Sequence, residues 1–296
     1  MDRLRAQLGR RVSFAEPLSG HTTWGVGGPA WALCRVRTAD EAAAVLTAAR
    51  AVGRSCLVLG RGSNLLVADA GFPGVVLRLE GELAALRVQG NHLTAGGGAT
   101  LAQALQQAAD ASLAGLEWAA GIPGTVGGAV AGNAGAHGRQ MSDLTAEVSL
   151  LLADGRVVTT AGGDLPADYR RRELPAGALV LAARLELTPA DPAAIRDLMR
   201  RAMQARRQSQ PLGARTAGSV FKNPPGDYAG RLIEACGCKG LAVGDAVVSS
   251  RHANFIENRG AATAGDVLGL MRQVADRVKR EFGVELEPEV RVVGDV

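Results

Sequence analysis

The chain has 296 residues, more than one hydrophobic core usually organises, so two or three domains are expected. Apolar residues make up 47% of the chain and aromatic residues 3%, which indicates cores of Ala, Val and Leu and excludes general disorder. The net charge is +4, without any block of like charge, and this favours a small anionic ligand over nucleic acid.

The start of the chain, MDRLRAQLGRRVSF, lacks the apolar stretch of a signal peptide. No apolar run approaches the roughly 20 residues of a membrane span. The four cysteines do not make a disulfide framework in a chain of this length, and Cys236 and Cys238 lack the second pair that a zinc site needs. We therefore expect reduced thiols, no metal, no membrane partner and a cytoplasmic location.

The first part of the chain alternates short apolar runs with helical patterns. Asp40 is expected as the N-cap of the first of these helices and Gly53 as its stop, and Thr100 as the N-cap of the second. Strands are expected at 31–36, 56–60, 74–79 and 92–98, and helices at 39–53 and 100–112.

The second part begins with a β-hairpin whose turn is Asp154-Gly155. Pro192 stands at the start of an amphipathic helix and Pro211 beyond its end, and a domain boundary is expected near 206–216. Further strands are expected at 177–188 and near 246–249 and in the final EVRVV, and further helices near 228–236 and 263–282.

Three glycine clusters stand out: GVGGPA at 25–30, GRGSNLLV at 60–67 and GIPGTVGGAVAGNAGAHG at 121–138. The second directly follows an apolar run, so its backbone amides can form an anion cradle suited to a pyrophosphate. It is not a G-x-G-x-x-G dinucleotide fingerprint, because the third position is Leu65. The third cluster suits an extended backbone that passes close to a large flat ligand.

Five motifs in order, GRGSNLLV, GIPGTVGGAVAGNAGAHG, AGSVFKNP, HANFIEN and LEPEVRVVG, span nearly the whole chain. Together they resemble the UDP-N-acetylenolpyruvoylglucosamine reductase family. The resemblance implies an α+β fold: a vanillyl-alcohol-oxidase/PCMH-type FAD-binding region of two α+β subdomains, with a C-terminal α+β substrate domain. The implied domains are FAD-binding subdomain 1 at 1–80, to which the strand at 288–296 returns, FAD-binding subdomain 2 at 81–206, and the substrate domain at 207–287.

The resemblance also implies site residues. Ser219 matches the family's proton donor, Glu289 its essential glutamate and Arg170 its essential arginine. The family commonly has a serine two positions after that arginine, where this chain has Arg172, so the register among Arg170, Arg171 and Arg172 stays open. The residues implied to hold FAD are Gly60, Arg61, Gly62, Ser63, Asn64, Leu65, Gly121, Ile122, Pro123, Gly124, Thr125, Gly127, Gly128, Asn133, Ala134 and Gly135. Those implied to bind substrate are Lys222, Asn223, Lys239, His252 and Asn254.

The implied reaction has two stages: NADPH reduces a non-covalently bound FAD, which then reduces UDP-N-acetylglucosamine enolpyruvate to UDP-N-acetylmuramate. Such an enzyme serves peptidoglycan precursor synthesis, and through it cell wall biogenesis, cell shape, the cell cycle and cell division. The final protonation needs an acid and no nucleophile, so a serine without a neighbouring base is adequate. The stretch 236–256 has no room for an extra tyrosine-bearing loop, which indicates the family's shorter subtype. The expected partner is a UDP-sugar, and the expected state is a monomer.

Two alternatives remain at this stage. A flavin oxidase or dehydrogenase of the vanillyl-alcohol-oxidase type would have a different substrate domain, and the presence of AGSVFKNP and PEVR disfavours it. A catalytically silent flavin- or nucleotide-binding module would bind FAD without NADPH turnover. His137 is the only nearby candidate for covalent flavin attachment, which is therefore not expected.

Overall fold

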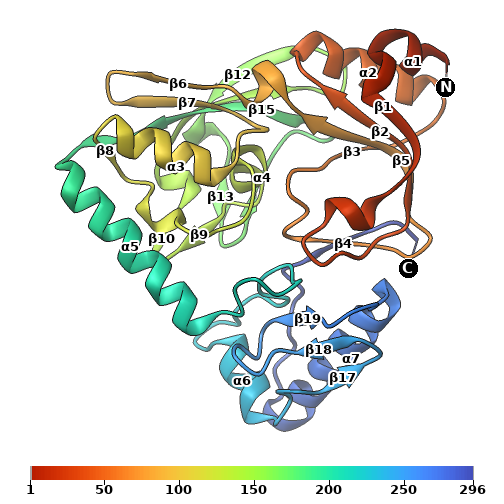
Figure 1. Ribbon diagram of the computed structural model, residues 1–296, viewed down its shortest axis with the longest axis vertical. Coiled ribbons are helices and arrows are strands. Elements are labelled where there is room, and N and C mark those ends of the chain that lie inside the picture. The colour runs from red at the N-terminus through yellow and green to blue at the C-terminus, as the bar shows by residue number, and fades with distance from the viewer. Residues whose placement is uncertain (1, 296) are drawn as a thin grey trace. The chain divides into compact units, whose positions relative to one another are not determined.

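The computed structural model in Figure 1 describes residues 2–295. The chain forms two compact units, each assembled from separate stretches of sequence. Unit 1 comprises residues 1–14, 31–60 and 74–205, and unit 2 comprises residues 15–30, 61–73 and 206–296. The division of the chain into two cofactor-binding subdomains and a substrate domain stays a prediction.

A four-stranded sheet opens unit 1. Its order is β1 (Val12–Pro17), β2 (Pro29–Val36), β5 (Phe72–Leu79) and β3 (Cys56–Val58), with β3 and β5 parallel. Helices α1 (Asp2–Leu8) and α2 (Ala39–Ala51) share its core, where Val45 packs with Leu77.

The second sheet of unit 1 is antiparallel, and its strands β12 and β11 form the predicted hairpin. Its order is β12 (Val157–Ala161), β11 (Thr145–Leu151), β15 (Leu179–Glu186), β7 (His92–Gly96) and β6 (Leu86–Gln89). Helices α3 (Leu101–Asp110) and α4 (Val126–Ala131) share its core, and Met199 and Ala202 of α5 (Pro192–Ser209) pack at its edge.

Three short antiparallel pairs complete unit 1. They are β8 (Leu113–Ala114) with β16 (Thr188–Pro189), β9 (Gly135–Ala136) with β10 (Arg139–Gln140), and β13 (Ala167–Asp168) with β14 (Arg171–Arg172). The 3₁₀ turn η4 (Glu117–Ala119) follows β8 in the chain, and the 3₁₀ turn η5 (Met141–Asp143) follows β10.

Unit 2 is built around Trp24, which is fully buried and donates its indole N–H to the carbonyl of Ile256 at 2.7 Å. Its elements are β17 (Ala242–Val243), β18 (Ala246–Val248) and β19 (Ile256–Asn258) in one sheet, the helices α6 (Ala229–Ala235) and α7 (Ala264–Phe282), and the parallel pair β4 (Leu65–Val67) and β20 (Arg291–Val293). The last strand therefore pairs with the final three residues of the second glycine cluster, 65–67.

Local sequence signals set the helix ends. A capping box between Thr100 and Gln103 starts α3, as expected for Thr100, and α7 ends at Gly283, whose φ is +68°. The prediction for α2 was wrong, because Thr38 is its N-cap and accepts from the amide of Glu41 at 3.2 Å. Asp40 lies instead in the first turn, where its charge still favours the helix dipole.

Candidate active site

The loop after β3 begins the predicted cofactor site in unit 1. Gly60 lies so close to Thr125 that a Cβ on the glycine would be 2.6 Å from the threonine Oγ1. Thr125 is the N-cap of α4, and its Oγ1 accepts from the amide of Gly128 at 3.3 Å. Two segments that the sequence predicts to hold FAD thus approach each other.

The rest of this loop belongs to unit 2. Gly62 has φ +60°, and a Cβ there would be 2.5 Å from the carbonyl oxygen of His21, so only glycine fits. The side-chain amide of Asn64 donates to the carbonyl of Glu289 at 3.2 Å, and the Asn64 carbonyl accepts from the amide of Arg291 at 3.1 Å. The loop is therefore tied by two hydrogen bonds to the segment that contains the predicted glutamate.

The segment around Ser219 lies between two other stretches of unit 2. The amide of Val220 donates to the carbonyl of Asn254, and its carbonyl accepts from the amide of Glu289, both at 2.9 Å. Ser219 itself forms a β-bridge with Phe255. Both Ser219 and Glu289 are half-buried. Unit 2 thus brings together Ser219, Glu289 and the loop residue Asn64.

Asn254 has a positioning role that the sequence did not indicate. It is 2% exposed, its Oδ1 accepts from the amide of Phe221 at 3.0 Å, and its Nδ2 donates to the Phe221 carbonyl at 2.8 Å. Both ends of the side-chain amide are used on the backbone two residues after Ser219. The predicted contact of Asn254 with substrate stays a prediction.

The two predicted substrate lysines have acidic partners. Lys222 pairs with Glu287 at 2.5 Å, and Lys239 pairs with Glu234 at 2.6 Å. Each glutamate side chain is more exposed than its lysine, at 69% and 59%. Exposed ion pairs of this kind contribute about 0–1 kcal/mol, so an anionic ligand can compete for either lysine.

Asn223 and His252 also contact the backbone of unit 2. The Oδ1 of Asn223 accepts from the amide of Ala229, the first residue of α6, at 3.1 Å. His252 Nδ1 accepts from the amide of Asn254 at 3.2 Å. Burial, with a smaller contribution from the charge of Lys239, lowers the pKa of His252 below its usual 6.5. Burial therefore favours the neutral imidazole.

Arg170 lies in unit 1, in the turn between β13 and β14. Its φ is +59°, a left-handed conformation that costs a residue with a side chain about 1–3 kcal/mol. One guanidinium nitrogen donates to the carbonyl of Gly135 at 2.9 Å, and the guanidinium lies 5.1 Å from the centre of the Tyr169 ring. Arg170 thus touches the third glycine cluster.

The two neighbouring arginines have other roles. Arg171 is exposed and pairs with Glu173 at 3.3 Å. Arg172 is 6% exposed and donates to the carbonyls of Gly162 at 2.8 Å and Leu165 at 3.3 Å, and burial lowers its pKa. Arg170 is therefore the candidate that contacts a residue predicted to hold FAD, through the carbonyl of Gly135.

Asn133 joins the third glycine cluster to the turn of Arg170. It is 1% exposed with φ +42°, a conformation that asparagine tolerates better than most residues. Its Nδ2 donates to the side chain of Gln140 and to the carbonyl of Asp168, both at 3.0 Å, and its Oδ1 accepts from the amide of Ser142 at 2.9 Å. Asn133 therefore positions the backbone here, and its predicted contact with FAD stays a prediction.

The backbone of the third cluster can accept a flat ligand. Gly128 is exposed, and a Cβ there would meet only Thr125 Oγ1, at 3.5 Å, so its open side is free of protein atoms. Gly127 faces the opposite way, and a Cβ on it would lie 2.9 Å from the carbonyl of Gly97. The open side of Gly128 therefore fits an organic cofactor that approaches exposed backbone. Among residues 2–295 no cluster of His, Cys, Asp or Glu could hold a metal ion.

Comparison with known proteins supports this interpretation. Residues 210–293 match the family model for the C-terminal domain of UDP-N-acetylenolpyruvoylglucosamine reductase, and residues 30–161 match an FAD binding domain. A UDP-N-acetylenolpyruvoylglucosamine reductase of Symbiobacterium thermophilum is 48% identical over 285 residues, which cover 96% of this chain and 92% of that protein. The chain belongs to the UDP-N-acetylenolpyruvoylglucosamine reductase family.

Two further relatives agree with this assignment. The reductase of Moorella thermoacetica is 45% identical, with 99% of this chain and 96% of that protein covered. The crystal structure of the reductase from Thermus caldophilus superposes with a TM-score of 0.84 and 42% identity over 96% of this chain and 98% of that one. The predicted family, the α+β fold class, the enzyme class and FAD as cofactor are thereby confirmed.

No helix within residues 2–295 is long and apolar enough to cross a membrane.

Proposed function

We propose that the protein reduces UDP-N-acetylglucosamine enolpyruvate to UDP-N-acetylmuramate, with NADPH as the electron donor, in peptidoglycan precursor synthesis. The support comes from relatives that carry the reductase name over nearly their whole length, and from the five motifs in order. The roles in cell wall biogenesis, cell shape, the cell cycle and division, the cytoplasmic location and the monomeric state belong to this proposal. The bound FAD would accept hydride from NADPH and pass it to the enolpyruvyl group.

Ser219 is the proposed proton donor to the reduced substrate. Its backbone is held on both sides, by Asn254 through Val220 and by Phe255, so its position is well determined. No other group among residues 2–295 makes a hydrogen bond with its hydroxyl, which leaves the O–H available to a ligand. A serine that lacks a base is a weak nucleophile, but it can protonate a strongly basic carbon centre.

Arg170 and Glu289 are the proposed partners of this step. A guanidinium beside the substrate carboxylate would stabilise the negative charge that develops there, by a charge-assisted hydrogen bond. The left-handed backbone of Arg170 is an observation that favours it over Arg171 and Arg172, because such strain concentrates at functional sites. The backbone amide of Glu289 donates to the carbonyl of Val220, the residue that follows Ser219 in the chain. The backbone carbonyl of Glu289 accepts from the side chain of Asn64.

The substrate diphosphate is the proposed ligand of Lys222 and Lys239. Both lysines are paired with glutamates whose side chains are largely exposed, so the anion can displace these weak partners. Asn223, His252 and Asn254 complete the proposed set. The chain's two tyrosines are Tyr169 and Tyr228, and neither lies in the stretch 236–256 that differs in the longer subtype.

An anaerobic flavin titration tests the proposal. The FAD-loaded protein is mixed with NADPH, and UDP-N-acetylglucosamine enolpyruvate is then added while the visible flavin band is followed. We expect bleaching by NADPH and full reoxidation by this substrate. Bleaching without substrate-dependent reoxidation would assign the protein another specificity, and a protein that binds FAD but ignores NADPH would be a silent binding module.

A further inference from the structure

The first glycine cluster of unit 2 is packed against the end of the second cluster and the residues that follow it. Gly27 has φ +134°, and a Cβ there would lie 2.8 Å from the Cβ of Val67. A Cβ on Gly28 would clash with the carbonyl oxygen of Asp69, and the amide of Gly28 donates to the carbonyl of Ala68 at 2.9 Å. These glycines therefore allow the backbone before them to lie beside the cofactor loop, residues 61–65.

The turn at 22–26, directly before these glycines, holds the carbonyl of Gly62. The hydroxyl of Thr22 closes the turn, because it donates to the carbonyl of Val26 at 2.7 Å and accepts from the Val26 amide at 3.2 Å. The next residue, Thr23, donates twice to the carbonyl of Gly62, from its amide at 3.2 Å and from its hydroxyl at 3.3 Å. Both lone pairs of the Gly62 carbonyl are thus used on the turn.

The turn is itself anchored in the core of unit 2 through Trp24. The buried indole donates to the carbonyl of Ile256, and the carbonyl of Trp24 accepts from the side-chain amide of Asn258 at 2.9 Å. Asn258 is 6% exposed. The turn is therefore a fixed support, and the cofactor loop takes its conformation from it.

This support decides which edge of one peptide group faces away from the turn. In a planar trans peptide the C=O and the N–H point in opposite directions, and residues 2–295 contain no cis peptide bond. Because the carbonyl of Gly62 points at Thr23, the N–H edge of the Gly62–Ser63 peptide points to the other side of the loop. A glycine has no Cβ to oppose rotation of this peptide, and the rotated peptide would direct its oxygen toward an anion bound there.

We infer that Thr22 and Thr23 are positioning residues for the flavin cofactor: their turn fixes the Gly62–Ser63 peptide with its N–H edge toward the diphosphate of FAD. Neither threonine has to touch FAD. The inference rests on the prediction that the loop 61–65 holds FAD. An anion cradle that is ordered in advance costs less to fill, so the turn strengthens the binding of FAD.

The dissociation constant of FAD tests this inference. FAD-loaded protein is diluted, and the rise in flavin fluorescence reports release of the cofactor. Thr22→Val keeps the shape of the side chain but removes both bonds to Val26, so we expect FAD to bind at least about tenfold more weakly. Thr22→Ser retains the hydroxyl and should stay within about threefold of the wild type.

A threonine of unit 1 provides the matched control. The hydroxyl of Thr47, on α2, donates to the carbonyl of Ala43 at 3.0 Å, and Thr47→Val should leave FAD binding unchanged. Unchanged FAD affinity in Thr22→Val, or an equal loss in Thr22→Ser, would overturn the inference. Circular dichroism shows whether the Thr22→Val protein stays folded after FAD is released. If it unfolds, Thr23→Ala carries the test, because it removes one of the two bonds to Gly62, and unchanged affinity there would overturn the inference.

One more variant distinguishes failure of the positioning role from failure of the predicted cofactor site. Ser63→Asp places a negative charge in the loop itself, which should repel a diphosphate held there. If Ser63→Asp leaves FAD affinity unchanged, the loop does not hold the diphosphate, and both the site prediction and the inference are wrong. If Ser63→Asp weakens FAD binding but Thr22→Val does not, the site prediction stands and only the positioning role is wrong.

Discussion

Each unit positions candidate site residues of its own with a buried asparagine, but the two asparagines do so differently. In unit 1, Asn133 has φ +42° and makes three hydrogen bonds, one of them to the carbonyl of Asp168 close to Arg170. In unit 2, Asn254 makes two side-chain bonds, both to the backbone of Phe221 close to Ser219. Asn133 joins separate turns of the backbone, whereas Asn254 extends a series of hydrogen-bonded backbone segments.

The difference shows in the backbone of the residues that are held. Arg170 and His137 are also left-handed, at φ +59° and +53°, so unit 1 positions its groups on a strained framework. In the segment of Ser219, isolated β-bridges instead join Ser219 to Phe255 and, two residues later, Phe221 to Pro288. We therefore expect substitutions in unit 1 to disturb catalysis by altering strained backbone turns, and substitutions in unit 2 to do so by breaking bridges between backbone segments.

The largest effect is expected for Ser219→Ala. It should leave flavin reduction by NADPH intact but slow reoxidation by UDP-N-acetylglucosamine enolpyruvate by about 10²–10⁴-fold, because a positioned general acid typically raises a rate by that factor. Anaerobic stopped-flow of the two half-reactions measures it. Ser149→Ala, on strand β11 of unit 1, is the matched control and should change neither phase. Equal slowing of both half-reactions by Ser219→Ala would count against its role as the acid.

The three arginines of unit 1 provide the next test. Arg170→Lys should lower the rate of the second half-reaction by about 10²–10³-fold, because lysine cannot reproduce the guanidinium geometry at developing charge. Arg172→Lys should chiefly lower stability, since its guanidinium bonds two buried carbonyls, and Arg171→Lys should do little. Kinetics together with urea unfolding separate the three, and a rate loss confined to Arg172→Lys would move the assignment there.

The two buried asparagines can be compared by replacing each of them with aspartate. Aspartate lacks the amide donors, so Asn133→Asp leaves two acceptors without a donor and Asn254→Asp leaves one. Each unmatched buried group costs about 1–3 kcal/mol, so Asn133→Asp should lower the free energy of unfolding more than Asn254→Asp. Urea unfolding at pH 7.5 measures both. The reverse order would falsify the view that unit 1 depends more on its asparagine.

The smallest expected effect is a pH dependence that is specific to unit 2. Burial favours the neutral form of His252, so its folded pKa lies below the unfolded value of 6.5. The associated stability is present above pH 6.5 and is lost as the pH falls through the folded pKa. Urea unfolding at pH 7.5 and 5.5 should show a smaller decrease in His252→Gln than in the wild type, whereas an equal decrease would assign the pH dependence to other groups.

Much of the candidate site followed from local patterns and from the family resemblance. In the third glycine cluster, Gly128 is exposed with an open side, as that pattern predicted, whereas Gly62 in the second cluster is buried against the carbonyl of His21. The positioning roles of Asn133 and Asn254 were not predicted, because asparagine next to glycine or after histidine has no local signature of burial. Their partners are up to 35 residues away, at Asp168 and Phe221.

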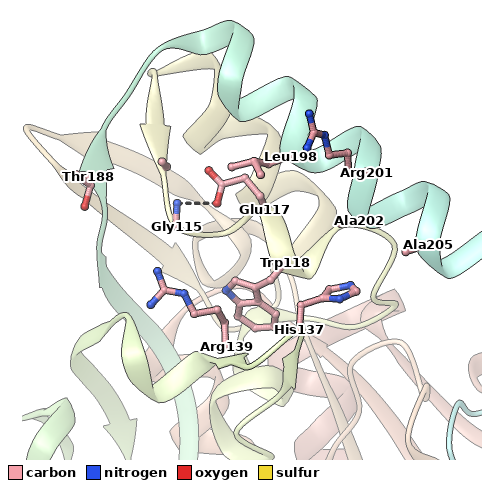
Figure 2. Close-up of a pocket in the computed structure, with 11 residues that line it drawn as sticks. Gly115, Glu117, Trp118, His137, Arg139, Thr188, Leu198, Arg201, Ala202 and Ala205 are labelled. Atoms are coloured by element: carbon pink, nitrogen blue, oxygen red, sulfur yellow. Dashed lines mark hydrogen bonds between the residues drawn. The ribbon is translucent and has the colours of Figure 1, made fainter.

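Local patterns predicted helices α2, α3, α5, α6 and α7, the β11–β12 hairpin and the family, because capping residues, apolar periodicity and motifs act over a few neighbouring residues. They did not predict α1 or α4, and α4 lies in a glycine cluster that was expected to be extended. Which arginine touches the third glycine cluster could be seen only in the folded chain, since it depends on the turn that gives Arg170 a left-handed backbone. The same holds for the pocket of about 580 Å³ in Figure 2, which exists because α5 passes η4, a segment about 80 residues earlier in the chain. Long-range packing of this kind leaves no periodic trace in the residues that form it.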